Sequence, residues 1–317
     1  MKWFVFVVLS LLLSHFPSCP SSLVTLCNND EAYALLGFKT SFSLGSRCGD
    51  EGGGYPKTES WKNGTDCCLW DGVSCDTNSG HVIGLNLSRS CFHAPFHFNN
   101  TLFKLTHLQK LNLALNNFSS SAMPSGFGHL LALTPHLNLS NAAFSESRMR
   151  IEPAFLEKLI VNATHLRELT LDGLDMSLIN PSSLSLLLNF SSSLFNRSTP
   201  LRHLDLGANA FSGHTQFLSN PTQLKHLDLG ANKFSGEILL SLSKLQRKLP
   251  QCVGNLSNLV VLNLQRNNLR GIIPRSYLEI ETLETLNFNG NQLEGPLPRH
   301  VIKCKHLRVL DLGHNDI

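Results

Sequence analysis

The chain has 317 residues, a formal net charge of +3, 42% hydrophobic residues and only 15% charged residues. It contains no block of lysine and arginine, so its composition gives no reason to expect nucleic acid as a partner. The length suits two globular domains or one long repetitive domain.

The first residues, MKWFVFVVLSLLLSHFPSCPSS, are typical of a secretion signal. One lysine precedes an apolar run from Trp3 to Leu13, which is shorter than the ~20 residues that span a bilayer. We expect a signal peptide over residues 1–22, and no later stretch approaches membrane-spanning length. The chain is therefore predicted to enter the secretory pathway.

The cysteines cluster near the N-terminus, and in an exported chain such a cluster favours disulfides. The alternative is a zinc site on Cys67, Cys68, Cys75 and His81. Adjacent cysteines fit zinc-ligand spacing poorly, and an oxidising compartment disfavours free thiolates, so we favour disulfides. The cysteines expected to form them are Cys27, Cys48, Cys67, Cys68, Cys75 and Cys91.

Residues 23–79 do not repeat and are expected to form an N-terminal cap. The segment NDEAYALLGFKTSF predicts an amphipathic helix with Asn29 or Asp30 as its N-cap. Its buried side is expected to consist of Leu35, Leu36 and Phe38. The tryptophans that follow, Trp61 and Trp70, are expected to cover the apolar end of the first repeat.

Residues 80–317 repeat the pattern L-x-L-x-x-N-x-F/L, most plainly as HLDLGANAF and HLDLGANKF. The regular steps are 23 to 26 residues, within the 20–29 residues of a leucine-rich repeat. We predict an α/β leucine-rich-repeat solenoid of about nine repeats, a curved right-handed coil with a parallel β-sheet on its concave face and loops or 3-10 turns on its convex side. The first leucines of the copies are Leu85, Leu111, Leu137, Leu169, Leu204, Leu227, Leu262, Leu286 and Leu310.

The asparagine of each copy falls where the chain turns out of the strand. Its side chain is expected to bond the backbone of neighbouring coils, which would otherwise keep unpaired polar groups. These residues are Asn116, Asn209, Asn232, Asn267, Asn291 and Asn315. A glycine follows four residues after several of them and permits a tight bend, at Gly213, Gly236, Gly271 and Gly295.

Some copies depart from the pattern. The segment LTPHL has one extra residue before Leu137, so we expect a bulge or a slipped strand there, with Pro135 as the inserted residue. The longer steps before Leu169 and Leu204 leave room for longer outer loops.

The step from Leu227 to Leu262 contains two outer segments with no strand between them. An internal deletion near 239–251 and a natural long loop explain it equally well. The chain then ends at Ile317, inside one more copy of the pattern. Because a solenoid needs a polar terminal cap, we expect this chain to be the front part of a longer protein, with its last repeat incomplete.

Alternate strand residues point away from the leucines onto the concave face. Ladders of paired carboxylates there suggest a glycosidase, but an open face offers no pocket to dry them and no carboxyl with a clearly raised pKa. We therefore expect no catalysis, no cofactor and no metal. Paired histidines permit a pH-dependent contact, although exposed imidazoles without a role explain them as well. The candidate ligand-binding residues are Glu168, Thr170, Asp172, His203, Asp205, His226, Asp228, Asn263, Gln265, Asn287 and Asn289.

Sequons for N-glycosylation occur throughout the chain, and in an exported protein we expect several to be modified. Asn86 and Asn138 stand between the two leucines of their strands, so a glycan there would cover the concave face. Recognition is therefore expected between Glu168 and Asp228 or along a flank. The sequons are at Asn63, Asn86, Asn99, Asn117, Asn138, Asn162, Asn189, Asn196 and Asn255.

The segments NDEAYALLGFK and SWKNGTDCCLWDGVSC resemble the N-terminal cap of plant extracellular leucine-rich-repeat proteins. The extra Cys48, SGHVIGLNLSRSCF and LPQCVGNLSNL are similar to plant receptor-like proteins of the disease-resistance type. The resemblance implies the pairs Cys27–Cys67 and Cys68–Cys75, after which a third pair of Cys48 and Cys91 follows only by elimination.

In that family the ectodomain senses a pathogen or developmental ligand and signals through partner receptor kinases. The resemblance thus implies an extracellular protein, peptide or glycan ligand and a receptor-kinase co-receptor. It implies the plasma membrane if the full-length protein has a C-terminal membrane helix, and secretion otherwise. A secreted inhibitor of a pathogen cell-wall-degrading enzyme and an inactive fragment are the alternatives.

Overall fold

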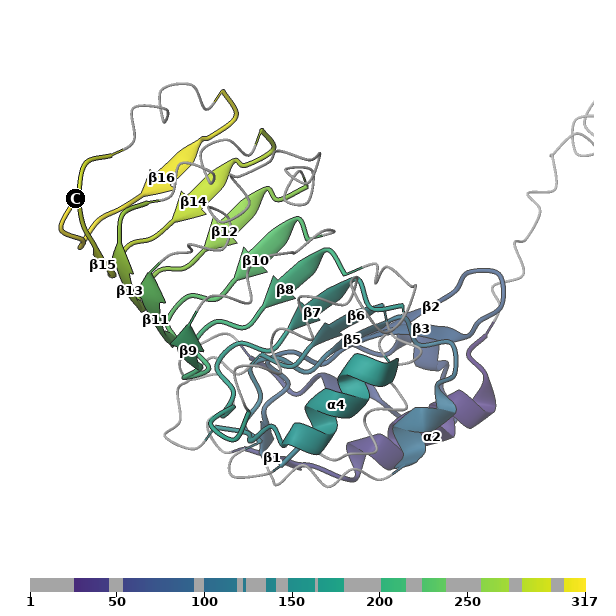
Figure 1. Ribbon diagram of the computed structural model, residues 1–317. Helices are drawn as coiled ribbons and strands as arrows, with labels where there is room; N and C mark the ends of the chain where they lie inside the picture. Colours follow the sequence, from purple (N-terminus) through teal and green to yellow (C-terminus); the bar gives the residue numbers. More distant parts are fainter. Residues whose placement is uncertain are drawn as a thin grey trace, which may run out of the picture.

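The protein was analysed as a computed structural model. The structure describes residues 26–45, 54–93, 100–118, 122–123, 135–140, 148–162, 165–179, 201–214, 224–237, 258–273, 281–297 and 305–317. Figure 1 shows a curved stack of coils, with the N-terminal cap at one end and the last strand at the other. The predicted signal peptide, Cys48 and the junction near 239–251 lie outside the described residues.

A ten-stranded sheet runs through the whole stack, in the order β16-β14-β12-β10-β8-β7-β6-β5-β3-β2. Only β2 is antiparallel to its neighbour; all the other pairs are parallel. The strands are β2 (Val73–Cys75), β3 (Val82–Asn86), β5 (Lys110–Asn112), β6 (His136–Asn138), β7 (Glu168–Thr170), β8 (His203–Asp205), β10 (His226–Asp228), β12 (Val261–Asn263), β14 (Thr285–Asn287) and β16 (Val309–Asp311).

The repeat alignment is confirmed by the register of this sheet. Each predicted first leucine pairs with the first leucine of the next copy, from Leu85 opposite Leu111 to Leu286 opposite Leu310. All but the last of these leucines are buried. Stacking therefore supplies the continuous core that a three-residue strand cannot form alone.

Register is kept at both irregular places that the structure describes. We expected a bulge or a slipped strand before Leu137, but β6 pairs with β5 and β7 without a shift, so neither is present in β6. The carbonyl of Pro135 accepts bonds from the amides of Arg167 and Glu168, which ties this turn to the next coil. β10 and β12 are also direct neighbours, so the sheet is continuous across the 35-residue step.

The convex side is more ordered than loops and 3-10 turns alone. A second parallel sheet joins β9 (Ser212–His214), β11 (Lys233–Glu237), β13 (Asn268–Gly271) and β15 (Gln292–Leu293). The long step before Leu169 contains a helix, α4 (Pro153–Asn162), where we expected a loop. The glycines of the repeat have positive φ, for example 92° at Gly236, which is the left-handed backbone that glycine adopts without strain.

The cap begins with helix α2 (Asn29–Lys39), whose N-cap is Asn28, one residue earlier than we expected. The Asn28 side chain accepts a bond from the amide of Asp30, and this bond satisfies one free donor of the first turn. Leu35 and Phe38 are buried as predicted, whereas Leu36 is only partly buried. The remaining elements of this region are β1 (Ser43–Leu44), which pairs with β4 (Phe92–His93), and the 3-10 helices η1 (Lys57–Ser60), η2 (Cys67–Leu69) and η3 (Asn100–Lys104).

Trp61 and Trp70 stack in the cap with ring centroids 5.6 Å apart. Both are buried, and each indole nitrogen donates a hydrogen bond, from Trp61 to the Asp71 carbonyl and from Trp70 to the Thr65 hydroxyl. Their apolar rings thus join the core at the end of the solenoid without leaving a buried donor unpaired.

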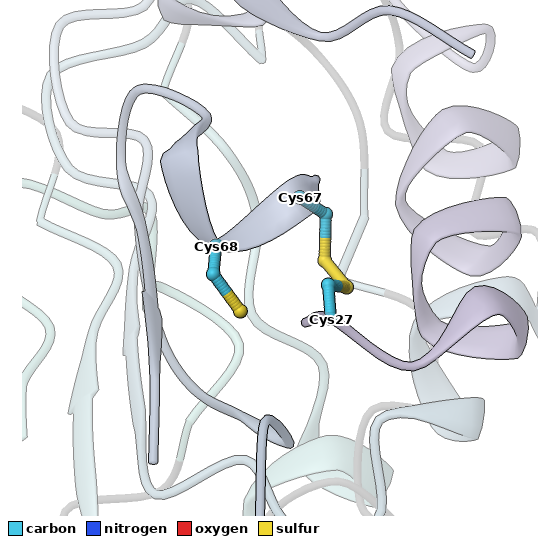
Figure 2. A group of neighbouring side chains, drawn as sticks. All are labelled: Cys27, Cys67 and Cys68. Atoms are coloured by element: carbon cyan, nitrogen blue, oxygen red, sulfur yellow. A yellow bond between two sulfur atoms is a disulfide. The ribbon is translucent and has the colours of Figure 1, made fainter. Parts of the chain in front are cut away.

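Two disulfides cross-link segments of the cap. They join Cys27 to Cys67 and Cys68 to Cys75, which are the pairs that the resemblance implies. Figure 2 shows the first of them between the start of α2 and η2. Cys91 is also disulfide-bonded, and its partner lies outside the described residues. These bonds take up the thiolates that the zinc alternative required.

A ladder of buried asparagines links consecutive coils, as predicted. Asn232 donates to the carbonyls of Leu206 and Leu229, and its oxygen accepts from the amides of Asn209 and Phe211. Asn116, Asn267 and Asn291 make corresponding bonds to the coil that precedes each of them. The ladder satisfies turn backbone groups that the core hides from water.

Candidate functional site

The predicted ligand-binding residues all lie on the ten-stranded sheet or two residues beyond its strands. In each central strand the leucine is buried while its two neighbours are partly exposed or exposed, as in His203-Leu204-Asp205. The parallel register places equivalent side chains in columns. One column contains His136, Glu168, His203 and His226, and the next contains Asn138, Thr170, Asp205 and Asp228.

We call the residues from Glu168 to Asp228 on this face the middle stretch. The imidazoles of His203 and His226 stack there with ring centroids 4.1 Å apart and an angle of 9° between their planes. Asp205 lies opposite Asp228 in the sheet, and each carboxylate accepts a bond from a backbone amide, at Gly207 and Gly230 respectively. The paired histidines and paired aspartates that were read from the repeat are therefore neighbours in space.

The carboxyl groups of the middle stretch are electrostatically strained. Partial burial, followed by the charges of Asp228 and Asp172, raises the pKa of Asp205 to about 6, although the bond from Gly207 acts in the opposite direction. Burial likewise raises the pKa of Asp172, with a further contribution from Asp228. Our expectation that no carboxyl on this face has a clearly raised pKa is wrong, because neighbouring coils bring three acids together while partly shielding them from water.

The stacked imidazoles are shifted in the opposite sense. Burial lowers the pKa of His203, although the charges of Glu168 and Asp228 oppose this shift. Burial also lowers the pKa of His226, and the charge of His203 lowers it further. Both imidazoles therefore take up a proton less readily than an ordinary histidine, which weakens the reading of the pair as a pH-dependent contact.

One functional neighbour was missed from the sequence. His136 on β6 lies beside Glu168, with its Nδ1 2.8 Å from the Glu168 carboxylate. Its position in HLNLS matches that of His203 and His226 in HLDLG, so aligning the copies by column would have found it. Ser140 was missed too, and its side chain hydrogen-bonds to Asp172.

The later coils carry a different set, which we call the amide stretch: Asn263, Gln265, Asn287, Asn289 and Asp311. Amides donate to acceptors on adjacent coils, from Asn263 to Asp228 at 2.8 Å, from Asn287 to Gln265 at 3.1 Å and from Asn289 to Asp311 at 3.0 Å. Asp311 lies at the end of this chain of bonds. The bonds from Asn289 and Gly313 lower its pKa.

The two sequons on the concave face differ in accessibility. Asn86 is exposed, whereas Asn138 is half-buried in the middle of the sheet. In both, the amide oxygen accepts from the serine two residues later, Ser88 or Ser140. Asn63 is exposed in the cap. Four predicted sequons lie outside the described residues: Asn99, Asn189, Asn196 and Asn255.

Family models match four segments of the chain. The leucine-rich-repeat N-terminal domain matches residues 28–76, and leucine-rich-repeat models match residues 104–123, 223–245 and 257–317. These matches and the register of the ten-stranded sheet show a leucine-rich-repeat solenoid with an N-terminal cap. Solenoids of this kind have extended concave surfaces, and the polar face described above is such a surface.

Plant receptor-like proteins are among its relatives. The leucine-rich-repeat chain is 39% identical to Receptor-like protein 6 of Arabidopsis thaliana over 193 residues, which cover 50% of this chain and 19% of the relative. It is 34% identical to Receptor-like protein Cf-9 of Solanum pimpinellifolium over 193 residues, covering 52% of this chain and 22% of the relative. The chain thus spans about a fifth of the length of these relatives. The relatives confirm the resemblance to plant receptor-like proteins.

Solved structures share the leucine-rich-repeat fold. The ectodomain of the Arabidopsis thaliana receptor kinase GASSHO1/SCHENGEN3 superposes with a TM-score of 0.58 at 24% identity, covering 89% of this chain and 32% of that one. PEPR1, solved with AtPEP1, gives a TM-score of 0.50 at 24% identity, covering 91% and 45%. Among the described residues, no helix is long and apolar enough to cross a membrane.

Proposed function

We propose that this chain is the extracellular ligand-recognition region of a plant receptor-like protein, and that its ligand docks on the middle stretch. The receptor-like proteins among its relatives support this assignment. The GASSHO1/SCHENGEN3 ectodomain, which shares the fold, was solved in complex with Casparian strip integrity factor 2. By the same analogy we propose defence or developmental signalling through a receptor kinase, from the cell surface or the extracellular space.

The observation that carries the proposal is the charge of the middle stretch. Asp172, Asp205 and Asp228 lie on neighbouring coils, and within the described residues no lysine or arginine forms an ion pair with them. Burial is the main cause of the raised pKa of Asp205, and repulsion from Asp228 and Asp172 adds to it. A ligand that brings cationic or hydrogen-bond donor groups relieves this repulsion. We therefore propose a ligand with basic side chains, such as a peptide that contains lysine or arginine.

The sequons agree with this placement. Glycans on Asn86 and Asn138 would cover the face on its N-terminal side, and the amide stretch satisfies many of its own polar groups on the other side. The middle stretch lies between the two. Its candidate contacts are Glu168, Thr170, Asp172, His203, Asp205, His226 and Asp228, and Asn263, Gln265, Asn287 and Asn289 would extend the contact along the later coils.

A display library of random linear peptides tests the proposal. The secreted chain is immobilised at pH 7, where the Asp205 carboxylate is ionised, peptides are selected, and single clones are then measured against the double variant Asp205→Asn, Asp228→Asn. We expect clones enriched in lysine and arginine whose affinity falls on the order of tenfold or more in that variant. The matched control is Asp311→Asn, which removes one charge from the same sheet outside the middle stretch and should leave binding unchanged.

Two results would overturn the proposal. One is a selection that yields no binding clones. The other is a set of clones that bind the double variant as tightly as the wild type, which would place recognition on another surface.

A further inference from the structure

A second cluster of titratable side chains lies away from the concave-face candidates, where the cap meets the first coils. Glu31 comes from α2, His81 directly precedes β3 and His107 precedes β5. The Glu31 side chain is only 5% exposed, whereas those of His81 and His107 are 30% and 52% exposed. Three segments that are distant in sequence thus bring one carboxylate and two imidazoles together.

The geometry of the cluster suits a metal ion. The Oε1 atom of Glu31 lies 3.3 Å from Nδ1 of His81 and 3.8 Å from Nδ1 of His107. All three potential ligand atoms lie within 4.8 Å of one another. In a tetrahedral zinc site with bonds of about 2.0–2.1 Å, ligand atoms are about 3.3–3.4 Å apart. The spacing between Glu31 and His81 matches this value, and the spacing between Glu31 and His107 exceeds it by about 0.4 Å.

The surroundings also resemble those of a metal site. The second carboxylate oxygen of Glu31 accepts a bond from the amide of Val82 at 2.9 Å, which orients the group and leaves Oε1 facing the histidines. A hollow of about 460 Å³ adjoins the imidazoles and has room for a water molecule as a fourth ligand. Asp76 lines the hollow, and bonds from Ser79 lower its pKa, so it adds a negative charge there.

We propose that Glu31, His81 and His107 bind a zinc ion or a similar divalent transition metal. Carboxylate and imidazole ligands select such metals over calcium or magnesium, which prefer oxygen ligands alone. The imidazoles now stack with centroids 3.8 Å apart, so binding turns the half-exposed His107 ring until its in-plane nitrogen faces the ion. The ion then ties the cap helix to the first two coils.

The same contacts also describe a carboxylate that accepts hydrogen bonds from two imidazoles without any metal, and the experiment must separate the two cases. The full chain, purified without a polyhistidine tag, is titrated with zinc sulfate at pH 7 by isothermal calorimetry. We expect one site that is lost, or weakened on the order of tenfold or more, in His107→Ala. His306→Ala removes another exposed imidazole, in the last coil, and should leave the titration unchanged.

Unfolding measurements give an independent readout. Zinc should raise the melting temperature of the wild type and of His306→Ala but not that of His107→Ala, since a ligand that binds only the native state stabilises it. The zinc effect should fade at pH 5, because protons compete for the imidazole nitrogens. Circular dichroism checks that His107→Ala remains folded. Absent zinc binding in the wild type, or binding that His107→Ala leaves intact, would overturn the proposal.

Discussion

The middle stretch and the amide stretch of the concave face share one backbone and differ in chemistry. Both lie on strands of the same sheet in unbroken register, and both rest on the same ladder of buried asparagines. In the amide stretch, side chains donate to their neighbours on the next coil. In the middle stretch, carboxylates stand beside carboxylates, and the pKa of Asp205 rises to about 6.

The difference shows that the repeat fixes the positions of the side chains on the concave face. It does not fix whether side chains on adjacent coils form hydrogen bonds or repel each other. An amide beside an acid gives a hydrogen bond, as between Asn289 and Asp311, and this bond lowers the pKa of Asp311. An acid beside an acid gives repulsion that a ligand with positive charge can relieve. Asn263, which donates to Asp228, marks the boundary between the two stretches.

The largest expected effect tests whether the scaffold is common to both stretches. Asn232→Ala removes the bonds that its side-chain nitrogen donates to three carbonyls and leaves the buried amides of Asn209 and Phe211 without their acceptor. The free energy of unfolding should therefore fall by about 3 kcal/mol. Asn291→Ala, under the amide stretch, should cost a similar amount for the same reason. Chemical denaturation measures both.

The control for these variants is Asn268→Ala, because Asn268 is exposed on β13 and should change stability little. The free energies of unfolding of Asn232→Ala and Asn291→Ala could differ from each other by more than either differs from that of the control. In that case the middle stretch and the amide stretch would not share one scaffold.

Removing one charge from the middle stretch should stabilise the protein. The folded pKa of Asp205, about 6, lies above the ordinary aspartate value of 3.8, so this group lowers the stability progressively as the pH rises from about 4 to about 6. Asp205→Asn keeps an oxygen that can accept from the Gly207 amide but carries no charge. Because Asp205 is partly exposed, we expect a gain of only about 1 kcal/mol at pH 7.

Thermal unfolding at pH 7 and at pH 4 measures this effect as the difference between variant and wild type. The gain should be present at pH 7 and largely absent at pH 4, where the wild-type carboxyl is protonated as well. An equal difference at both pH values would show that the effect does not come from the charge.

The corresponding substitution in the amide stretch should have the opposite sign and a smaller size. Hydrogen bonds from Asn289, and then from Gly313, lower the pKa of Asp311, so its ionised form stabilises the fold above pH 3.8, and this contribution is lost as the pH falls through the folded pKa. Asp311→Asn should therefore melt slightly lower at pH 7 and converge with the wild type in strong acid. A stabilised Asp311→Asn would show that the two stretches do not differ in this way.

Much of this fold could be predicted because aligning the copies of a repeat also gives the register of the strands that they form. Leu85 through Leu310 align in the sequence as they do in the sheet, and the asparagine ladder follows from the same spacing. Helix α4 was missed because a single longer step carries no repeated signal to compare with. The second sheet was missed because its strands are short and pair with one another only once the coils are stacked.

The candidate sites were less predictable, because they depend on distances between coils. The columns of His203 and Asp205 could be read from the repeat, but the raised pKa of Asp205 depends on how far the coils shield it from water. The cluster of Glu31, His81 and His107 left no signal, because its members lie 50 and 26 residues apart without a shared motif. Only the packing of the cap on the first coils brings them together.

The smallest expected effect concerns the stacked imidazoles and decides which group responds to mild acid. Burial lowers the pKa of both His203 and His226 below 6.5, and the charge of His203 lowers that of His226 further. Proton NMR titration should therefore give values below 6.5 for both rings, and His203→Gln should raise the pKa of His226. Because the pKa of Asp205 is raised to about 6 while those of both imidazoles are lowered, we expect the Asp205 carboxyl to change its charge around pH 6. Titration of either imidazole above 6.5 would instead assign the response to the histidines.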